Sequence, residues 1–309
     1  MKDIAAPSDS PITKIEQACR SVVALRESPL LVLYYPGGMG TMNVSDVADC
    51  YQAFRNSGVT PEAPLSNCDV LLHTYGGDPT AAYQLAELIR RLAQRVTFLV
   101  PKNAYSAGSL LCFSGNEVRM GHYAGLSPID ITFEWRTTEG GRERAELVSI
   151  DHFMDFAAQS QKQIAQGSAV GSDLMCKLVD EVGALRVGAF FRNRTITGAY
   201  AQELLDSYML KGRPNGVGRR NRIIRELLFE APSHEHHFGL RLCRKLGLEV
   251  TEMPTTEFDV TAKAVETLDA MAADGSICLE VTDEEKMPFV AFFPLATTTM
   301  EVHDEHGAK

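Results

Sequence analysis

The sequence has few of the features that mark secreted or membrane-spanning proteins. Its seven cysteines are an odd number, scatter along 309 residues and include no CxxC pair. That pattern is typical of reduced thiols rather than of a disulfide framework. The first residues lack the apolar core of a signal peptide, and no later segment reaches the roughly 18 apolar residues of a membrane span. We therefore expect a cytoplasmic protein without a membrane span.

Positive charge is also scarce. The chain has 30 lysines and arginines against 40 aspartates and glutamates, which gives a formal net charge of -10 at pH 7. An excess of negative charge repels nucleic acid phosphates on average, so nucleic acid is not an expected partner. One segment, residues 211–222, is glycine-rich and basic. A solvated loop is the default interpretation of such a run.

Short apolar runs alternate with helical patterns in the first half of the chain. Residues 30–35, 69–75 and 96–100 have the length and composition of buried strands, and residues 81–92 place apolar side chains at helical spacing. Strands and helices that alternate with short joints predict right-handed βαβ units. The sequence therefore predicts an α/β protein with a mainly parallel core sheet and flanking helices.

The same pattern gives a provisional division of the chain. Residues 1–28 are predicted as an N-terminal extension and residues 29–275 as the main domain, with a soft internal boundary near 145. Residues 276–309 are predicted as a C-terminal extension, because they contain apolar runs of strand length followed by a charged end.

Two segments contain the parts that acyl transfer needs: a nucleophile, and backbone N–H groups aimed at the developing oxyanion. Gly76 and Gly77 end a predicted strand, which leaves the Gly77 N–H free to donate and lets a substrate backbone approach. Ser106 stands where a helix of small residues begins, with the Ala107 N–H beside it. On residue statistics alone, a helix N-cap and a turn are the more common roles.

A resemblance to known proteins favours a catalytic role for these two segments over a turn and an N-cap. HTYGGDPTAAYQLAELIRRLAQRVTFLVPKNAYSAGSLLCFSGNEVRMGHYAGLSPIDI and, downstream, APSHEHHFGLRLCRKLGLEVTEMP resemble two blocks of the serine dehydrogenase proteinase family, relatives of signal peptide peptidase A and Clp protease. The usual family motifs are HTPGG, PxxAxSxGT, DEIxM, LGPxDPQ and THDYPI. The resemblance implies a Clp protease/crotonase-like fold and a homo-oligomeric serine peptidase without cofactor or metal. It also implies that Ser106 is the nucleophile and that Gly77 and Ala107 form the oxyanion hole.

The substrate region differs from the family pattern. HTPGG has become HTYGG, which puts Tyr75 in place of proline, and the Gly-Pro of LGPxDPQ has become Ser127-Pro128. Tyr75, Gly76 and His234 are the residues we expect to bind a peptide or protein substrate, in a groove that differs from that of the relatives. The histidines near residue 234 lack the spacing of a helical zinc pattern, so no metal site is predicted.

The general base is not fixed by the sequence. No histidine stands near Asp130, where a Clp-type triad would place one. Lys162, on the following predicted helix, is the candidate for a Ser-Lys dyad, but it falls off the apolar stripe, which favours a surface position. Asp130 and Lys102 are alternative partners.

Two other functions are compatible with these residues. A chain that has lost its base would be a catalytically silent scaffold that binds a peptide or protein partner, since a fold does not determine a function. A crotonase-like acyl-CoA enzyme would use the same N–H groups to hold an enolate, although the Ser-Ala-Gly block around Ser106 argues against it.

Overall fold

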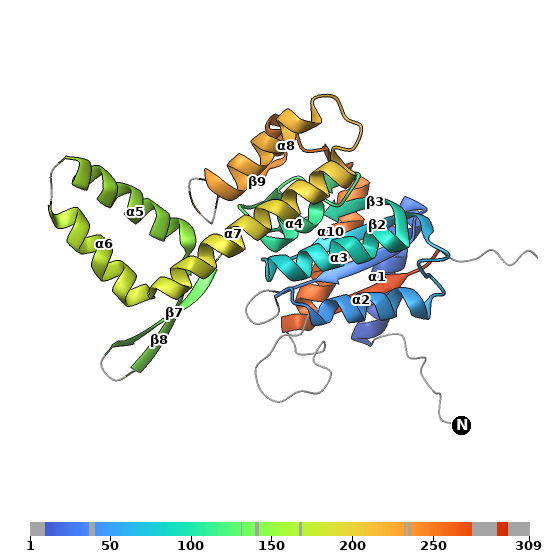
Figure 1. The fold of residues 1–309 in the computed structure, drawn as a ribbon. Coiled ribbons are helices and arrows are strands. Elements are labelled where there is room, and N and C mark those ends of the chain that lie inside the picture. Colours follow the sequence, from blue (N-terminus) through green and yellow to red (C-terminus); the bar gives the residue numbers. More distant parts are fainter. Residues whose placement is uncertain are drawn as a thin grey trace, which may run out of the picture.

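A six-stranded sheet forms the centre of the molecule (Figure 1). The computed structural model describes residues 10–36, 41–130, 132–139, 142–166, 169–231, 233, 236–273 and 289–295. The sheet order is β10 (Val250–Glu252), β5 (Glu117–Met120), β3 (Ala93–Val100), β2 (Leu65–His73), β1 (Leu30–Tyr34) and β11 (Phe289–Phe293). All neighbours are parallel except β11, which runs antiparallel to β1. The predicted α/β class with a mainly parallel sheet is confirmed.

Helices cover both faces of this sheet, which explains why β1 is buried along its whole length. On one face lie α2 (Ser45–Asn56), α3 (Pro79–Leu92) and the short α4 (Ala107–Cys112). On the other lie α1 (Pro11–Arg26) and α10 (Thr255–Ala273). The segments predicted as terminal extensions therefore contribute α1 and β11 to this core.

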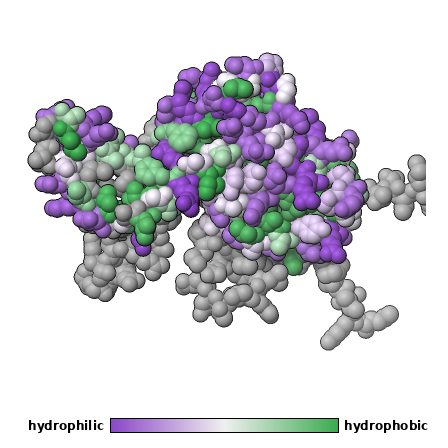
Figure 2. Space-filling model, viewed as in Figure 1, coloured by the Kyte–Doolittle hydropathy of each residue, from purple (hydrophilic) through white to green (hydrophobic). Residues whose placement is uncertain are grey.

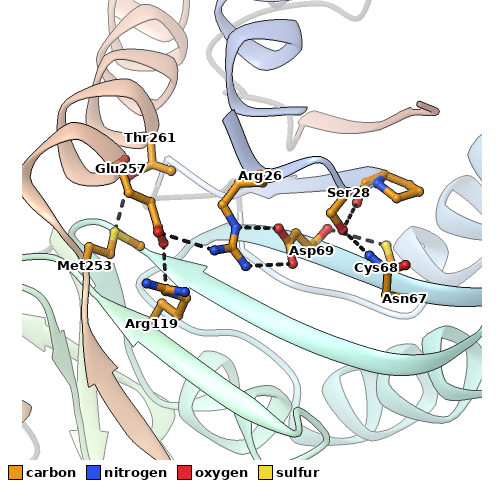
Figure 3. A network of polar contacts seen from close by, with 10 residues as sticks. Arg26, Ser28, Asn67, Cys68, Asp69, Arg119, Met253, Glu257 and Thr261 are labelled. Atoms are coloured by element: carbon orange, nitrogen blue, oxygen red, sulfur yellow. Dashed lines mark hydrogen bonds and ion pairs between the residues drawn. The ribbon is translucent and has the colours of Figure 1, made fainter. Parts of the chain in front are cut away.

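A buried ion network joins the helices of the second face to the sheet (Figure 3). Arg26 of α1 pairs with Asp69 of β2 at 2.8 Å and with Glu257 of α10 at 3.3 Å, and Arg119 of β5 pairs with Glu257 at 2.9 Å. Burial raises the pKa of both carboxyl groups, although the two arginines oppose that shift. Each buried carboxylate therefore depends on its arginine partners.

A second, three-stranded sheet links segments that are far apart in the sequence. β6 (Gly125–Leu126) pairs in parallel with β4 (Asn103–Ala104) and antiparallel with β9 (Phe238–Gly239). β9 lies in the downstream block of the family resemblance, and the other two strands lie in the upstream block. The two blocks thus meet in space, directly beside Ser106.

An arm extends from the core at the left of Figure 1. It contains the hairpin of β7 (Thr132–Glu139) and β8 (Arg142–Ser149), and the helices α5 (Ile150–Ala165), α6 (Ala169–Val182) and α7 (Ala184–Leu204). The end of α7 enters the core through Ala201 and Leu204. Figure 2 shows hydrophobic side chains on the surface of the arm and along α7, and Leu185 is 92% exposed.

The chain returns from the arm through helical segments. α7 continues into the π-helical segment η1 (Leu205–Met209), and α8 (Gly216–Ile224) continues into the π-helical segment η2 (Arg225–Phe229); α9 (Leu240–Leu246) follows β9. The prediction of a solvated basic loop at residues 211–222 is wrong from Gly216 onward. Tertiary contacts explain the difference, because Arg219 bonds to the carbonyl of Gly247 and Ile223 of the same helix is fully buried. None of the helices in the described part of the chain combines the length and apolar character needed to cross a bilayer.

Candidate functional site

The chain that follows β2 is held from both sides. Thr74 pairs with the strand β4: its N–H donates to the Asn103 carbonyl and its carbonyl accepts from the Tyr105 N–H. Gly77 forms a parallel bridge with Met42 that uses the flanking Gly76 carbonyl and the N–H of residue 78. This pairing leaves the N–H of Gly77 itself unused. Among the described residues, it donates no hydrogen bond.

Both glycines are required by the geometry. Gly77 has φ +148°, and a Cβ built on it would lie 2.2 Å from the Met42 carbonyl oxygen. Gly76 has φ +125°, and a Cβ there would lie 2.9 Å from the Ser106 Cβ. A side chain at either position would strain the backbone and collide with its neighbour. Gly76 therefore marks the point where the segment after β2 contacts Ser106.

Ser106 has an unusual backbone conformation, with φ 49° and ψ -114°, just before α4. Ser106 occupies the N-cap position of that helix, but its side chain makes no capping hydrogen bond to it. A non-glycine residue rarely adopts such angles, and strain of this kind clusters at functional sites. The side chain is 8% exposed and lies beside Gly76.

A buried serine cluster holds this conformation. The Ser106 N–H donates to the Ser127 Oγ at 2.8 Å. The Ser127 N–H donates to the Ser109 Oγ at 3.0 Å, and that hydroxyl also lies 2.8 Å from the Ala104 carbonyl oxygen. Sequence reasoning missed the role of Ser127. The signal that could have found it was the replacement of the Gly-Pro of the family motif by Ser-Pro at this position.

The N–H of Ala107 completes a candidate oxyanion hole. Ala107 is the first residue of α4, where an N–H has no acceptor within the helix. In the described part of the chain it donates no hydrogen bond. Gly77 and Ala107 follow the two residues, Gly76 and Ser106, that contact each other. Two N–H groups that donate no hydrogen bond among the described residues thus belong to the residues that follow Gly76 and Ser106 in the chain.

The candidates for the base lie in different places. Lys162 is exposed on α5. Figure 1 shows that helix in the arm, well apart from α4. Asp130 is buried at the end of the turn that contains Ser127. No lysine, histidine or aspartate among the described residues forms a hydrogen bond with the Ser106 hydroxyl. His234 lies outside the described residues.

Lys102 is engaged elsewhere. Its ammonium lies 2.7 Å from a carboxylate oxygen of Asp269, and the Tyr34 hydroxyl donates to the same carboxylate at 2.7 Å. Burial lowers the pKa of Lys102, but the hydrogen bond and charge of Asp269 outweigh it and raise the pKa above its usual value. Lys102 is therefore a charge partner of Asp269 and a poor proton acceptor.

Rings extend from the core to the surface beside Ser106. His73, at the end of β2, stacks on Tyr34 with 5.5 Å between ring centroids, and it meets Tyr75 edge-on, also with 5.5 Å between centroids. Tyr75 in turn lies 6.1 Å from Tyr105, the residue before Ser106. Burial lowers the pKa of His73 to about 4, so this imidazole is neutral near pH 7. Among the described residues, its Nδ1 has no hydrogen-bond partner.

No metal centre is formed by the described residues, since no three histidine, cysteine, aspartate or glutamate side chains gather there in a suitable group. An uncharacterized protein of Methanocaldococcus jannaschii is 31% identical over 85 residues, which make up 27% of this chain. The match spans 28% of the length of that protein. No protein-family model and no solved structure matches the chain.

Proposed function

We propose that this protein is a serine hydrolase with a Clp protease/crotonase-like fold that cleaves peptide bonds through an acyl-enzyme on Ser106. The observation that carries the proposal is the strained backbone of Ser106, which packs against Gly76 and makes no capping bond. A strained serine at the start of a helix is consistent with an acyl-transfer nucleophile, and the N–H groups of Gly77 and Ala107, which donate no hydrogen bond among the described residues, are candidates for the oxyanion donors. The resemblance of both sequence blocks to a peptidase family supports peptides as the substrate class.

In the proposed reaction, the Ser106 Oγ attacks the scissile carbonyl carbon and loses its proton to a base. The carbonyl oxygen becomes negative and accepts hydrogen bonds from Gly77 and Ala107. A single donor of this kind contributes a factor of about 10² to 10³ to the rate. The amine leaves with a proton, and water then hydrolyses the ester on Ser106. The reaction would take place in the cytoplasm, as the cysteine pattern predicts, and in a homo-oligomer without a cofactor, as the resemblance implies.

We expect the general base close to Ser106 rather than in the arm. Asp130 is three residues beyond Ser127, whose hydroxyl accepts the Ser106 N–H. His237 precedes β9, and its Nδ1 lies 3.3 Å from the Tyr105 hydroxyl. Separate Asp130→Asn and His237→Gln variants test these groups, because loss of a base removes the corresponding limb from the pH–rate profile.

The decisive experiment compares Ser106→Ala with a matched surface control, Ser66→Ala, whose serine is exposed on β2. We expect the wild type and the control to cleave casein or mixed peptides and to be labelled by a fluorophosphonate. Ser106→Ala should lose labelling, and its cleavage rate should fall by a factor on the order of 10³ or more. Equal activity in all three folded proteins would contradict the proposal.

One observation favours a second function. Because no base is hydrogen-bonded to the Ser106 hydroxyl among the described residues, the site would also serve as a silent scaffold that binds a peptide or protein. In that case the wild type would not react with the fluorophosphonate, yet would bind peptides with the same affinity as Ser106→Ala.

A further inference from the structure

Three rings form a surface row beside Ser106: Tyr75, Tyr105 and His237. Tyr75 is 51% exposed, Tyr105 is half-buried and His237 is exposed. Neighbouring rings in the row meet edge-on, with centroids 6.1 Å and 6.4 Å apart. The Tyr105 hydroxyl and the His237 Nδ1 are also 3.3 Å apart. The row is continuous, and it presents ring faces and edges to solvent.

The strand register fixes the position of the row. In the sheet of β4, β6 and β9, Asn103 pairs with Gly125 and Gly125 pairs with Gly239, so Tyr105 and His237 project from the same face. Glycine at 125 makes room for the imidazole, because a Cβ there would lie 2.0 Å from the His237 Cε1. The His237 ring therefore lies close to Gly125, next to Tyr105.

The row adjoins the proposed nucleophile directly. Tyr75 precedes Gly76, and Tyr105 precedes Ser106. A Cβ on Gly76 would lie 2.9 Å from the Ser106 Cβ and 3.6 Å from the Tyr105 carbonyl oxygen. A peptide whose carbonyl reaches Ser106 must therefore pass within side-chain reach of the two tyrosine rings.

The inner end of the row is anchored. Tyr75 rests edge-on against buried His73, which stacks on Tyr34, and the Tyr34 hydroxyl is bonded to Asp269. Because the Tyr75 ring packs against His73, its exposed part stays in contact with solvent. A preformed aromatic surface costs little ordering entropy when a ligand binds.

We propose that Tyr75, Tyr105 and His237 bind an aromatic side chain of the peptide substrate, next to the scissile bond. The inference rests on the proposed function and adds a substrate preference to it. Ring pairs that meet edge-to-face gain about two- to tenfold in affinity beyond the burial of an apolar group of equal size. The row itself contains no carboxylate, so basic side chains gain no ion pair with it.

The test measures peptide binding to Ser106→Ala, in which no cleavage disturbs the equilibrium. Matched fluorescent peptides carry phenylalanine, cyclohexylalanine, alanine or glutamate at one varied position, which is moved along the peptide in turn. At one position we expect phenylalanine to bind about two- to tenfold more tightly than cyclohexylalanine, and at least tenfold more tightly than alanine or glutamate. Tyr75→Leu should reduce the first difference and retain most of the second. Tyr75→Ala should reduce both.

A control variant is Tyr51→Ala, which removes a 37% exposed tyrosine on α2 and should preserve all preferences. Equal binding of phenylalanine and cyclohexylalanine at every position would overturn the inference, as would an unchanged preference in folded Tyr75→Ala. Binding is measured without turnover. An aromatic preference in Ser106→Ala together with an unreactive wild type would therefore support the aromatic binding site and contradict the hydrolase activity. Cleavage by the wild type without an aromatic preference would support the hydrolase activity and contradict the aromatic binding site.

Discussion

The core and the arm differ in how firmly their residues are held. Around the sheet, side chains such as Leu33, Leu72 and Phe98 are fully buried, and helices cover both faces. In the arm, Leu185 and Phe191 are exposed apolar residues on α7, and Lys162 projects into solvent from α5. The comparison teaches that the candidate site is built entirely by the core, at the ends of β2 and β4. The arm carries only the candidate base that the sequence had suggested.

The largest expected effect comes from breaking the buried ion network of the core. Arg26→Met should lower the free energy of unfolding by about 3 to 5 kcal/mol, because Asp69 and Glu257 lose a partner while they stay buried. Denaturant unfolding followed by circular dichroism measures the difference.

Arg20→Met on the same helix is the matched control. Arg20 pairs with Glu16 at 3.0 Å, with both side chains about half exposed, so its loss should cost less than about 1 kcal/mol. Equal losses in the two variants would show that the network contributes no more than a surface pair.

An intermediate effect is expected from acid. Burial lowers the pKa of His73 to about 4 from an ordinary value of 6.5, so between these values the unfolded chain binds the proton and the folded chain does not. Stability should therefore fall as the pH falls through this range, by about 3 kcal/mol. Unfolding free energies at about pH 7 and about pH 4 measure the loss.

His73→Phe keeps a ring between Tyr34 and Tyr75 but cannot be protonated. Its stability should fall less than that of the wild type over the same range. The raised pKa values of Asp69 and Glu257 act in the opposite direction in both proteins, so they cancel in the comparison. Parallel pH curves would show that His73 is not the group responsible.

The smallest effect is expected in the arm. Lys162→Met replaces an exposed side chain that has no contact with Ser106, so cleavage should change by less than about twofold and stability by less than about 0.5 kcal/mol. Peptide cleavage rates of Lys162→Met and Ser106→Ala are measured in the same assay, so that the loss in Ser106→Ala gives the scale for the effect of Lys162→Met. A loss close to that of Ser106→Ala would show that the arm supplies a catalytic residue, so that the site would not be built by the core alone.

Much of the core was predictable because its signals are local. Buried parallel strands appear as continuous apolar runs, and α3 shows its apolar residues at helical spacing after Asp78, which caps it. The helix α8 was not predictable from its composition, because contacts of Arg219 and Ile223 with distant segments stabilise a glycine-rich basic stretch. The pairing of β11 with β1 joins opposite ends of the chain, and no local pattern encodes it.

The sequence by itself determined the α/β class and pointed to Ser106, Gly76 and Gly77, since strand length, helical spacing and glycine placement are properties of short segments. Only the tertiary structure decided that Ser106 has a strained backbone and makes no side-chain capping bond, that Ser127 supports it, and that Tyr75, Tyr105 and His237 share one surface. These relations depend on contacts between β4, β6 and β9 across more than a hundred residues of chain. Such contacts form when the core closes, and residue order alone does not specify them.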